Sequence, residues 1–185
     1  MANNTGKLEL FIGPMFSGKS TELIKNVRLH QVLNRNVLVL KPKIDDRYDN
    51  NRIVTHSGEK EDCSISIDDL QNISIEIIQK YDIIVIDEGQ FFKSLKECCL
   101  TWVEKYDKHV IVGGLDGDFL RKPIGEILDL IPYADSYKKL CALCKICNDG
   151  TFALFSKRII NNKDEQVLIG GAESYISVCR KHYLT

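Results

Sequence analysis

The sequence predicts an α/β fold with a mainly parallel sheet, followed by a small β-rich module that holds a metal. Short apolar runs alternate with longer amphipathic segments, as strands and helices do in such a sheet. A glycine-rich phosphate-binding motif, or P-loop, joins the first run to the first amphipathic segment. Pairs of residues at metal-ligand spacing follow near the C-terminus. We therefore expect a P-loop α/β domain over residues 1–140 and a zinc-ribbon module over residues 141–185.

Continuous apolar runs predict strands that are covered on both faces, as in a parallel sheet. These runs are residues 8–12, 37–40, 83–86 and 110–112. Apolar residues at helical spacing predict helices over residues 20–34, 68–81 and 93–106. We expect Asp68 to cap the second helix.

The predicted module has two β-like runs, 152–155 and 167–169, on either side of a polar turn at 161–164. A module of about 45 residues buries little apolar surface by itself, so a bound metal would stabilise it.

Composition narrows the possible functions. The chain has 185 residues, of which 44% are hydrophobic and 28% charged, and a formal net charge of −1. This charge disfavours a general nucleic-acid binder, which usually has a basic excess. No apolar run approaches the roughly 20 residues that span a bilayer, and residues 1–7 are too polar for a signal peptide. We expect a cytoplasmic protein with no nucleic-acid or membrane partner.

The seven cysteines of such a protein are better explained as thiols or metal ligands than as disulfides. Cys63, Cys98 and Cys99 have no motif spacing, and we expect them to fill buried apolar space.

The strongest motif is GPMFSGKS at residues 13–20, which fits the P-loop pattern GxxxxGK[ST] between a predicted strand and helix. Backbone N–H groups of such a loop and the N-terminus of the helix bind phosphate oxygens. Lys19 would reach the β- and γ-phosphates of a nucleotide, and the Ser20 hydroxyl would bind Mg²⁺. The alternative, a glycine-rich turn without a ligand, is disfavoured by this context. The predicted nucleotide-binding residues are Gly13, Pro14, Met15, Phe16, Ser17, Gly18, Lys19, Ser20 and Asp87.

Two acidic residues follow the third apolar run. Because α/β folds bind ligands at the carboxyl ends of their strands, Asp87 is placed to complete the Mg²⁺ shell. Glu88 could deprotonate an acceptor hydroxyl or activate a water, or it could be a solvated or capping carboxylate. Arg47, in a polar loop, could stabilise a transferring phosphate, although a lone loop arginine is more often solvated.

The metal-ligand pattern is Cys144-x-x-Cys147 with Cys179-x-x-His182, which is typical of tetrahedral zinc. Four protein ligands fill the coordination sphere, so we expect a structural zinc ion rather than a catalytic one. Cys141 could replace Cys144, but the CxxC spacing favours Cys144.

Together the motifs resemble the type II, cellular-type thymidine kinases, whose core is similar to the RecA-like fold. The matching stretches cover most of residues 7–183 in the family's order; they are GPMFSGKSTEL (13–23), DDRY (45–48), TH (55–56), DEGQFF (87–92), GLDGDF (114–119), RKP (121–123), SKR (156–158), GG (170–171) and SVCR (177–180). The resemblance implies transfer of the γ-phosphate of ATP, with Mg²⁺, to the 5′-hydroxyl of thymidine or deoxyuridine in nucleotide salvage. It also implies a homo-oligomer, commonly a tetramer.

The same resemblance implies roles for individual residues. Glu88 would be the general base, while Lys19 and Arg47 would stabilise charge on the transferring group. Met15, Ser156 and Tyr175 would surround the thymine methyl group. The other substrate positions are Asp45 at the sugar, Phe91, Leu115 and Phe119 in the apolar pocket, and the backbone of Val167, Leu168, Ile169 and Gly170 at the base edge. That edge would mismatch cytosine, and each unpaired buried polar group costs about 1–3 kcal/mol.

The chain departs from the animal members of this family at several positions. His182 stands where they have a cysteine, Asp118 where they have a threonine, and Ile124 where they have a phenylalanine. We expect these changes to affect specificity towards nucleoside analogues rather than the type of reaction.

Three other functions fit parts of the sequence. A RecA-like motor with a nucleic-acid-binding zinc ribbon is disfavoured by the neutral charge. A nucleoside monophosphate kinase would need cations for the acceptor phosphate, and Arg121 and Lys122 could serve. A non-catalytic binding module is disfavoured by the presence of Lys19, Asp87 and Glu88 together.

Overall fold

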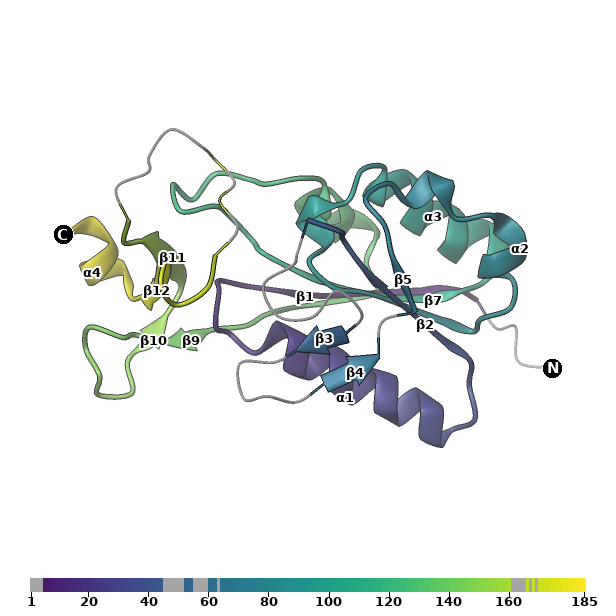
Figure 1. Cartoon of the computed structure of the whole chain (residues 1–185), viewed down its shortest axis with the longest axis horizontal. Helices are drawn as coiled ribbons and strands as arrows, with labels where there is room; N and C mark the ends of the chain where they lie inside the picture. The colour runs from purple at the N-terminus through teal and green to yellow at the C-terminus, as the bar shows by residue number, and fades with distance from the viewer. Residues whose placement is uncertain are drawn as a thin grey trace.

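The structure is a computed structural model that describes residues 5–44, 52–54, 60–62, 64–160, 166, 168 and 170–185. Its centre is a six-stranded sheet in the order β5-β2-β6-β7-β1-β8, in which every neighbouring pair is parallel (Figure 1). The strands are β1 (Lys7–Ile12), β2 (Val37–Lys41), β5 (Ile65–Ser66), β6 (Ile83–Ile86), β7 (His109–Gly114) and β8 (Ser136–Lys139). The predicted α/β fold with a mainly parallel sheet is confirmed.

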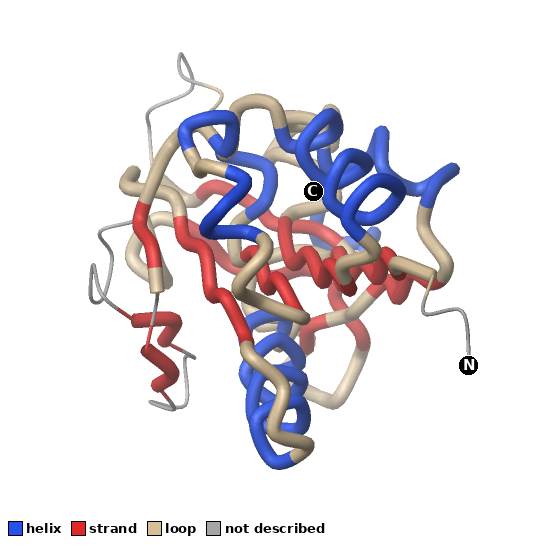
Figure 2. The backbone as a smooth tube through the Cα atoms, turned by 90° about the vertical axis from the view of Figure 1, so that its right-hand side faces the viewer, coloured by secondary structure: helices blue, strands red, loops and turns tan. Residues whose placement is uncertain are grey.

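Helices cover both faces of this sheet. Figure 2 shows the strands as a layer with α1 (Lys19–Val32) below it and the other large helices above it. The upper layer contains η1 (Leu70–Asn72), α2 (Ile75–Ile78), α3 (Leu95–Tyr106) and η3 (Ile127–Tyr133). None of the helices in the described parts of the chain has the length and apolar character to span a bilayer.

The two faces of the strands explain why the apolar runs are continuous. Val39, Val85 and Ile111 point towards α1 and pack with Leu23 and Val27 of that helix. Alternate residues of the sheet strands pack on the opposite face with η3 and with α3, which contributes Trp102; these strand residues include Leu10, Leu38, Ile84 and Val112. With apolar neighbours on both sides, these strands have no solvent-facing positions for polar residues.

The prediction of one continuous helix over residues 68–81 is wrong. The segment is divided into η1 and α2 by Ile73, whose backbone is extended (φ −88°, ψ 116°). Asp68 does not cap a helix, because its Oδ1 accepts a hydrogen bond from the Lys43 backbone N–H at 3.0 Å. Asp69 caps η1 instead, through the Gln71 N–H at 3.1 Å. Tertiary contacts of this segment therefore override its helical periodicity.

Strands β5 and β8 were not predicted. All four residues of β8 are exposed, so this edge strand lacks the apolar run on which the prediction depended. It pairs in parallel with β1, with Glu9 opposite Ser136. A separate antiparallel pair, β3 (Arg52–Val54) and β4 (Lys60–Asp62), lies beside α1.

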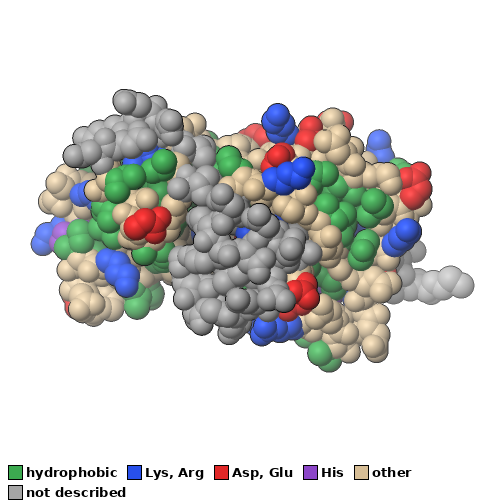
Figure 3. Space-filling view, viewed as in Figure 1, with side chains coloured by type: hydrophobic (Ala, Val, Ile, Leu, Met, Phe, Trp, Pro, Cys, Tyr) green, Lys and Arg blue, Asp and Glu red, His purple; other side chains and the backbone are tan. Residues whose placement is uncertain are grey.

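The C-terminal module contains two short antiparallel pairs. They are β9 (Ala142–Leu143) with β10 (Phe152–Ala153), and β11 (Phe155–Arg158) with β12 (Tyr175–Val178), and α4 (Arg180–Leu184) ends the chain. The run predicted at 152–155 is divided between β10 and β11, whereas the turn at 161–164 and most of 167–169 lie outside the described residues. Figure 3 shows hydrophobic side chains gathered over this end of the molecule, where the exposed large ones are Leu143, Ile146, Phe152, Ile159, Ile160 and Leu184.

Candidate active site and metal centre

The P-loop lies between β1 and α1, as predicted. Gly18 has φ 83°, a left-handed conformation that suits glycine, and α1 begins at the next residue. A Cβ atom on Gly13 would lie 2.6 Å from the carbonyl oxygen of Leu140, so the loop passes the segment just before the module too closely for a side chain. Lys19 is 7% exposed, and its Nζ donates a hydrogen bond to the Pro14 carbonyl at 2.8 Å across the loop.

Two features of this loop suit a phosphate ligand. The 14-residue helix α1 presents its N-terminus to the loop, where backbone N–H groups and the helix dipole favour an anion. The Oγ of Ser17 is buried and has no hydrogen-bond partner among the described residues. A bound phosphate oxygen would satisfy this hydroxyl, so the loop fits the nucleotide that its sequence predicts.

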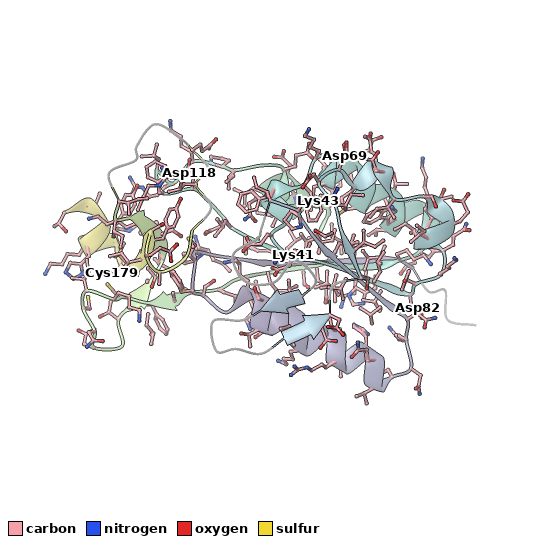
Figure 4. All side chains as sticks on the ribbon, in the orientation of Figure 1. Lys41, Lys43, Asp69, Asp82, Asp118 and Cys179 are labelled. Atoms are coloured by element: carbon pink, nitrogen blue, oxygen red, sulfur yellow. The ribbon has the colours of Figure 1, made fainter. Side chains whose placement is uncertain are left out.

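Ser20 and Asp87 meet at the carboxyl edge of the sheet. Ser20 lies in the first turn of α1, which follows β1 through the P-loop, and Asp87 directly follows β6, which is separated from β1 by β7. The Ser20 hydroxyl donates to Asp87 Oδ2 at 3.4 Å. Asp87 is 4% exposed. A hydroxyl and a carboxylate at one point are hard oxygen ligands of the kind that Mg²⁺ prefers, so this pair fits the predicted ion. Lys41, which was not predicted, is buried at the end of β2 and so lies at the same edge as Asp87 (Figure 4).

Glu88 occupies an unusual backbone conformation. It has φ 52° and ψ 44°, the left-handed region, and it precedes the 3₁₀ turn η2 (Gly89–Phe91). Its N–H donates to Asp87 Oδ1 at 3.0 Å. Left-handed residues other than glycine cost about 1–2 kcal/mol and are found preferentially at functional sites. The sharp turn thus directs two adjacent carboxylates to different positions at the same strand end.

Gln90 is a residue that the sequence did not single out. Its Nε2 donates to Glu88 Oε2 at 2.6 Å, and its Oε1 accepts from the backbone N–H of Leu115 at 2.9 Å. Its only signal in the sequence was its position within DEGQFF, which does not reveal where the side chain points. Leu115 directly follows β7, while Phe91 ends η2 and is half-buried.

The predicted nucleoside-side residues of the module contact the P-loop and one another. The Ser156 Oγ accepts from the backbone N–H of Met15 at 2.9 Å. The Tyr175 hydroxyl donates to the Leu168 carbonyl at 2.9 Å and accepts from the Arg158 guanidinium at 2.8 Å. That guanidinium also lies 3.8 Å from the centre of the Phe119 ring. Phe119, Leu168 and Tyr175 are thus brought together around Arg158, which the sequence showed only as part of SKR.

Asp118 joins the loop after β7 to the segment before Leu168. Its Oδ1 accepts from the backbone N–H groups of Leu120 and Lys122, both at 2.8 Å. Its Oδ2 accepts from Gln166 Nε2 at 2.9 Å, and Figure 4 places Asp118 at the same end of the molecule as Cys179. Gly170 is buried next to Ser174.

Four predicted site residues lie outside the described residues: Asp45, Arg47, Val167 and Ile169.

The predicted metal ligands form one cluster, in which the ligand atoms of Cys144, Cys147, Cys179 and His182 all lie within 4.8 Å of one another. Tetrahedral zinc holds two sulfur ligands about 3.8 Å apart, and a sulfur and a nitrogen about 3.6 Å apart. The Cys147 and Cys179 sulfurs are 3.8 Å apart. His182 Nδ1 lies 3.6, 3.3 and 3.4 Å from the sulfurs of Cys144, Cys147 and Cys179.

The protonation of Cys144 also suits a metal. Desolvation raises the pKa of its thiol, but hydrogen bonds from the backbone N–H groups of Cys147 and Cys179 outweigh this and lower the pKa to about 6. Cys141 is exposed and is not part of the cluster.

By contrast, Cys98 and Cys99 are buried as expected, and desolvation raises the pKa of both, to about 11 for Cys98. Cys63 lies outside the described residues.

The P-loop, the acidic pair at the same edge of the sheet and the four-ligand cluster define a P-loop α/β protein that carries a candidate zinc module. The profile of the thymidine kinase family matches residues 6–183, and the chain belongs to this family.

Similar proteins span most of the chain. It is 42% identical over 185 residues to "Thymidine kinase a" of Arabidopsis thaliana. This match covers 98% of this chain and 76% of the Arabidopsis protein. The chain is 44% identical over 183 residues to "Thymidine kinase" of Yaba monkey tumor virus, in a match that covers 99% of this chain and 97% of the viral protein. "Thymidine kinase 1" of Dictyostelium discoideum is 40% identical over 185 residues, covering 96% and 78%.

Proposed function

We propose that this protein is an ATP-dependent kinase that transfers the γ-phosphate of ATP to the 5′-hydroxyl of thymidine, and of deoxyuridine, in nucleotide salvage. One observation carries the proposal: Ser20 of the P-loop and the Asp87–Glu88 pair meet at one edge of the sheet in a chain of the thymidine kinase family. Phosphate binding, Mg²⁺ binding and proton removal are then available at one place.

Each residue would have a defined task in this reaction. The loop from Gly13 to Ser20 would hold the triphosphate, with Lys19 at the β- and γ-phosphates. Ser20 and Asp87 would hold Mg²⁺, which neutralises phosphate charge when bound. Glu88 would accept the proton of the 5′-hydroxyl as it attacks, and Arg47 would stabilise the transferring group.

The nucleoside would lie between the sheet edge and the module. Met15, Ser156 and Tyr175 would surround the 5-methyl group, and Phe91, Leu115 and Phe119 would form the apolar pocket. The backbone of residues 167–170 would read the base edge, and Asp45 would contact the sugar. Two hydrogen bonds support this assignment: the Met15 backbone N–H donates to Ser156 Oγ, and the Tyr175 hydroxyl donates to the carbonyl of Leu168.

We further propose that the Cys144, Cys147, Cys179 and His182 cluster holds a structural zinc ion, and that residues 1–140 and 141–185 form the two domains. The ligand spacing supports zinc, which would anchor the segment that reads the base. We also propose a cytoplasmic homo-oligomer, a tetramer by family resemblance. Leu29, Val32 and Leu33 are exposed at the end of α1 and offer an apolar surface for self-association.

The test is phosphate transfer from labelled ATP, with Mg²⁺, to the four deoxynucleosides and deoxyuridine. We expect label on thymidine and deoxyuridine alone, and none with a Lys19→Met variant. ATP hydrolysis stimulated by DNA without a labelled nucleoside would instead indicate a nucleic-acid motor. Phosphorylation of thymidine monophosphate exceeding that of thymidine would indicate a monophosphate kinase.

A further inference from the structure

Gln90 is held at both ends of its side chain. It is 3% exposed, and its amide lies between the Glu88 carboxylate, at 2.6 Å, and the Leu115 backbone N–H, at 2.9 Å. An N–H group can only donate, so the Leu115 contact requires the amide oxygen to face Leu115. The amide NH₂ must therefore face Glu88. The hydrogen-bond network itself, rather than an arbitrary choice between nitrogen and oxygen, sets this orientation.

Two glycines prevent Gln90 from moving away. A Cβ atom on Gly125 would lie 2.1 Å from the Gln90 carbonyl oxygen, and Gly125 has φ 58°, so its backbone packs directly on that of Gln90. A Cβ atom on Gly114 would lie 2.4 Å from Gln90 Oε1, so a second glycine backbone packs against the amide. The side chain is enclosed by main chain that cannot yield as a flexible side chain could.

We propose that Gln90 is a positioning residue for the proton-accepting carboxylate of Glu88. This inference rests on the proposed function. The amide fixes the rotation of the carboxylate, and because a donor to a charged oxygen favours the charged form, it keeps Glu88 ready to accept a proton. The same amide contacts the backbone of Leu115, so the position of the base is tied to that of the proposed pocket wall.

Gln90→Glu and Gln90→Met separate this role from a merely structural one. Glutamate retains an oxygen for the Leu115 N–H but replaces the donor to Glu88 by a second carboxylate, and two carboxylates in contact share a proton. Methionine fills the same space and removes both hydrogen bonds. A structural role through Leu115 therefore predicts a defect in Gln90→Met alone, whereas positioning of Glu88 predicts a defect in both variants.

The measurement is the pH profile of kcat and of KM for thymidine, with the melting temperature of each variant. For Gln90→Glu we expect kcat at pH 7 to fall at least about tenfold, the acidic limb to move to higher pH by about one to two units, and activity to recover as pH rises. The KM should change less than about threefold. Gln90→Met should move the limb in the same direction by a smaller amount, and it also serves if Gln90→Glu does not fold.

A wild-type pH profile in Gln90→Glu, or in Gln90→Met if only that variant folds, overturns the inference. Glu88→Gln keeps this result distinct from failure of the proposed function. If the wild-type protein does not phosphorylate thymidine, the proposed function is wrong. If Glu88→Gln retains wild-type turnover, Glu88 is not the base and Gln90 cannot position it. In these two cases the activity of the wild-type protein or of Glu88→Gln gives the answer, and the pH profiles of the Gln90 variants do not.

Discussion

The parallel sheet and the C-terminal module are stabilised in different ways. The sheet has apolar side chains on both faces: Leu10 and Ile84 pack in one cluster with Trp102 of α3, and Val85 packs on the other face with Leu23 of α1. Among the described residues, the buried cluster of the module consists of small side chains, Val178 and a candidate metal ligand, Cys144, while larger side chains such as Phe155 and Tyr183 are only partly buried against it. The sheet is stabilised by burial, whereas the module would gain stability from the zinc ion that we propose.

This difference matches the proposed division of work. The sheet edge presents Ser20, Asp87 and Glu88, which must not move during chemistry. The module presents Ser156 and Tyr175, which contact the P-loop and the Leu168 segment. A small module with few fully buried side chains would be suited to carry the proposed nucleoside-binding segment. We therefore expect substitutions at the sheet edge to affect catalysis and substitutions in the module to affect metal content and nucleoside binding.

The largest effect should come from the sheet edge and should leave both regions folded. Glu88→Gln should lower kcat by roughly 10²–10⁴-fold, because it removes the proposed proton acceptor, while binding of ATP and thymidine is retained. The measurement is kcat together with nucleoside affinity by calorimetry. Glu97→Gln, at an exposed carboxylate on α3, is the matched control and should have wild-type kcat.

The second effect should be confined to the module. Cys147→Ser removes one of four ligands, so zinc content should fall from about one to near zero per chain, with several kcal/mol of module stability lost. The sheet should keep its own core, so the far-ultraviolet circular dichroism of α1 and α3 should remain. Zinc is measured by elemental analysis. Cys141→Ser should retain zinc, and full zinc retention in Cys147→Ser would contradict the proposed ligand set.

A smaller effect should come from the contact between the two regions. Ser156→Ala leaves the buried Met15 N–H without its acceptor, which costs about 1–3 kcal/mol, and KM for thymidine should rise by about tenfold or more. Ser177→Ala is the control inside the module, because Ser177 Oγ donates to the Leu143 carbonyl at 2.8 Å. That control should lower the melting temperature without raising KM. Equal KM changes in both variants would show that Ser156 has no particular role in binding.

The smallest effect should lie in the sheet region, at the end of α1. His30 is buried with its Nδ1 unpartnered among the described residues, and its ring meets that of His109 edge to face. Desolvation, with the positive charges of His109, Arg35 and Lys7, lowers the pKa of His30, although Glu9 opposes this. The unfolded chain then binds a proton near pH 6.5 that the folded chain does not bind. The free energy of unfolding therefore falls as pH decreases through that value.

The slope from one histidine is less than about 1.4 kcal/mol per pH unit. His30→Leu should flatten the pH dependence of the free energy of unfolding between pH 7 and 5, as measured in urea. Gln31→Ala, at the exposed neighbouring position, should leave the wild-type slope. An unchanged slope in His30→Leu would assign the acid sensitivity to other groups.

Features that depend on neighbouring residues were determined by the sequence alone. The P-loop could be predicted because its glycines, lysine and serine follow one another in a single turn, and the cluster of candidate metal ligands because each pair lies three residues apart. The buried strands could be predicted because burial on both faces leaves a continuous apolar run.

Features that depend on distant residues were decided only by the tertiary structure. The hydrogen bond from Met15 to Ser156 joins residues 141 positions apart, and no local pattern encodes it. Contacts from Lys43 and Lys93 help to divide the predicted helix at 68–81. Gln90 acquires its contacts only because the end of β7 lies beside the turn that carries Glu88. The physical reason is the same in each case: folding brings a partner from elsewhere in the chain, and that partner decides what a polar group does.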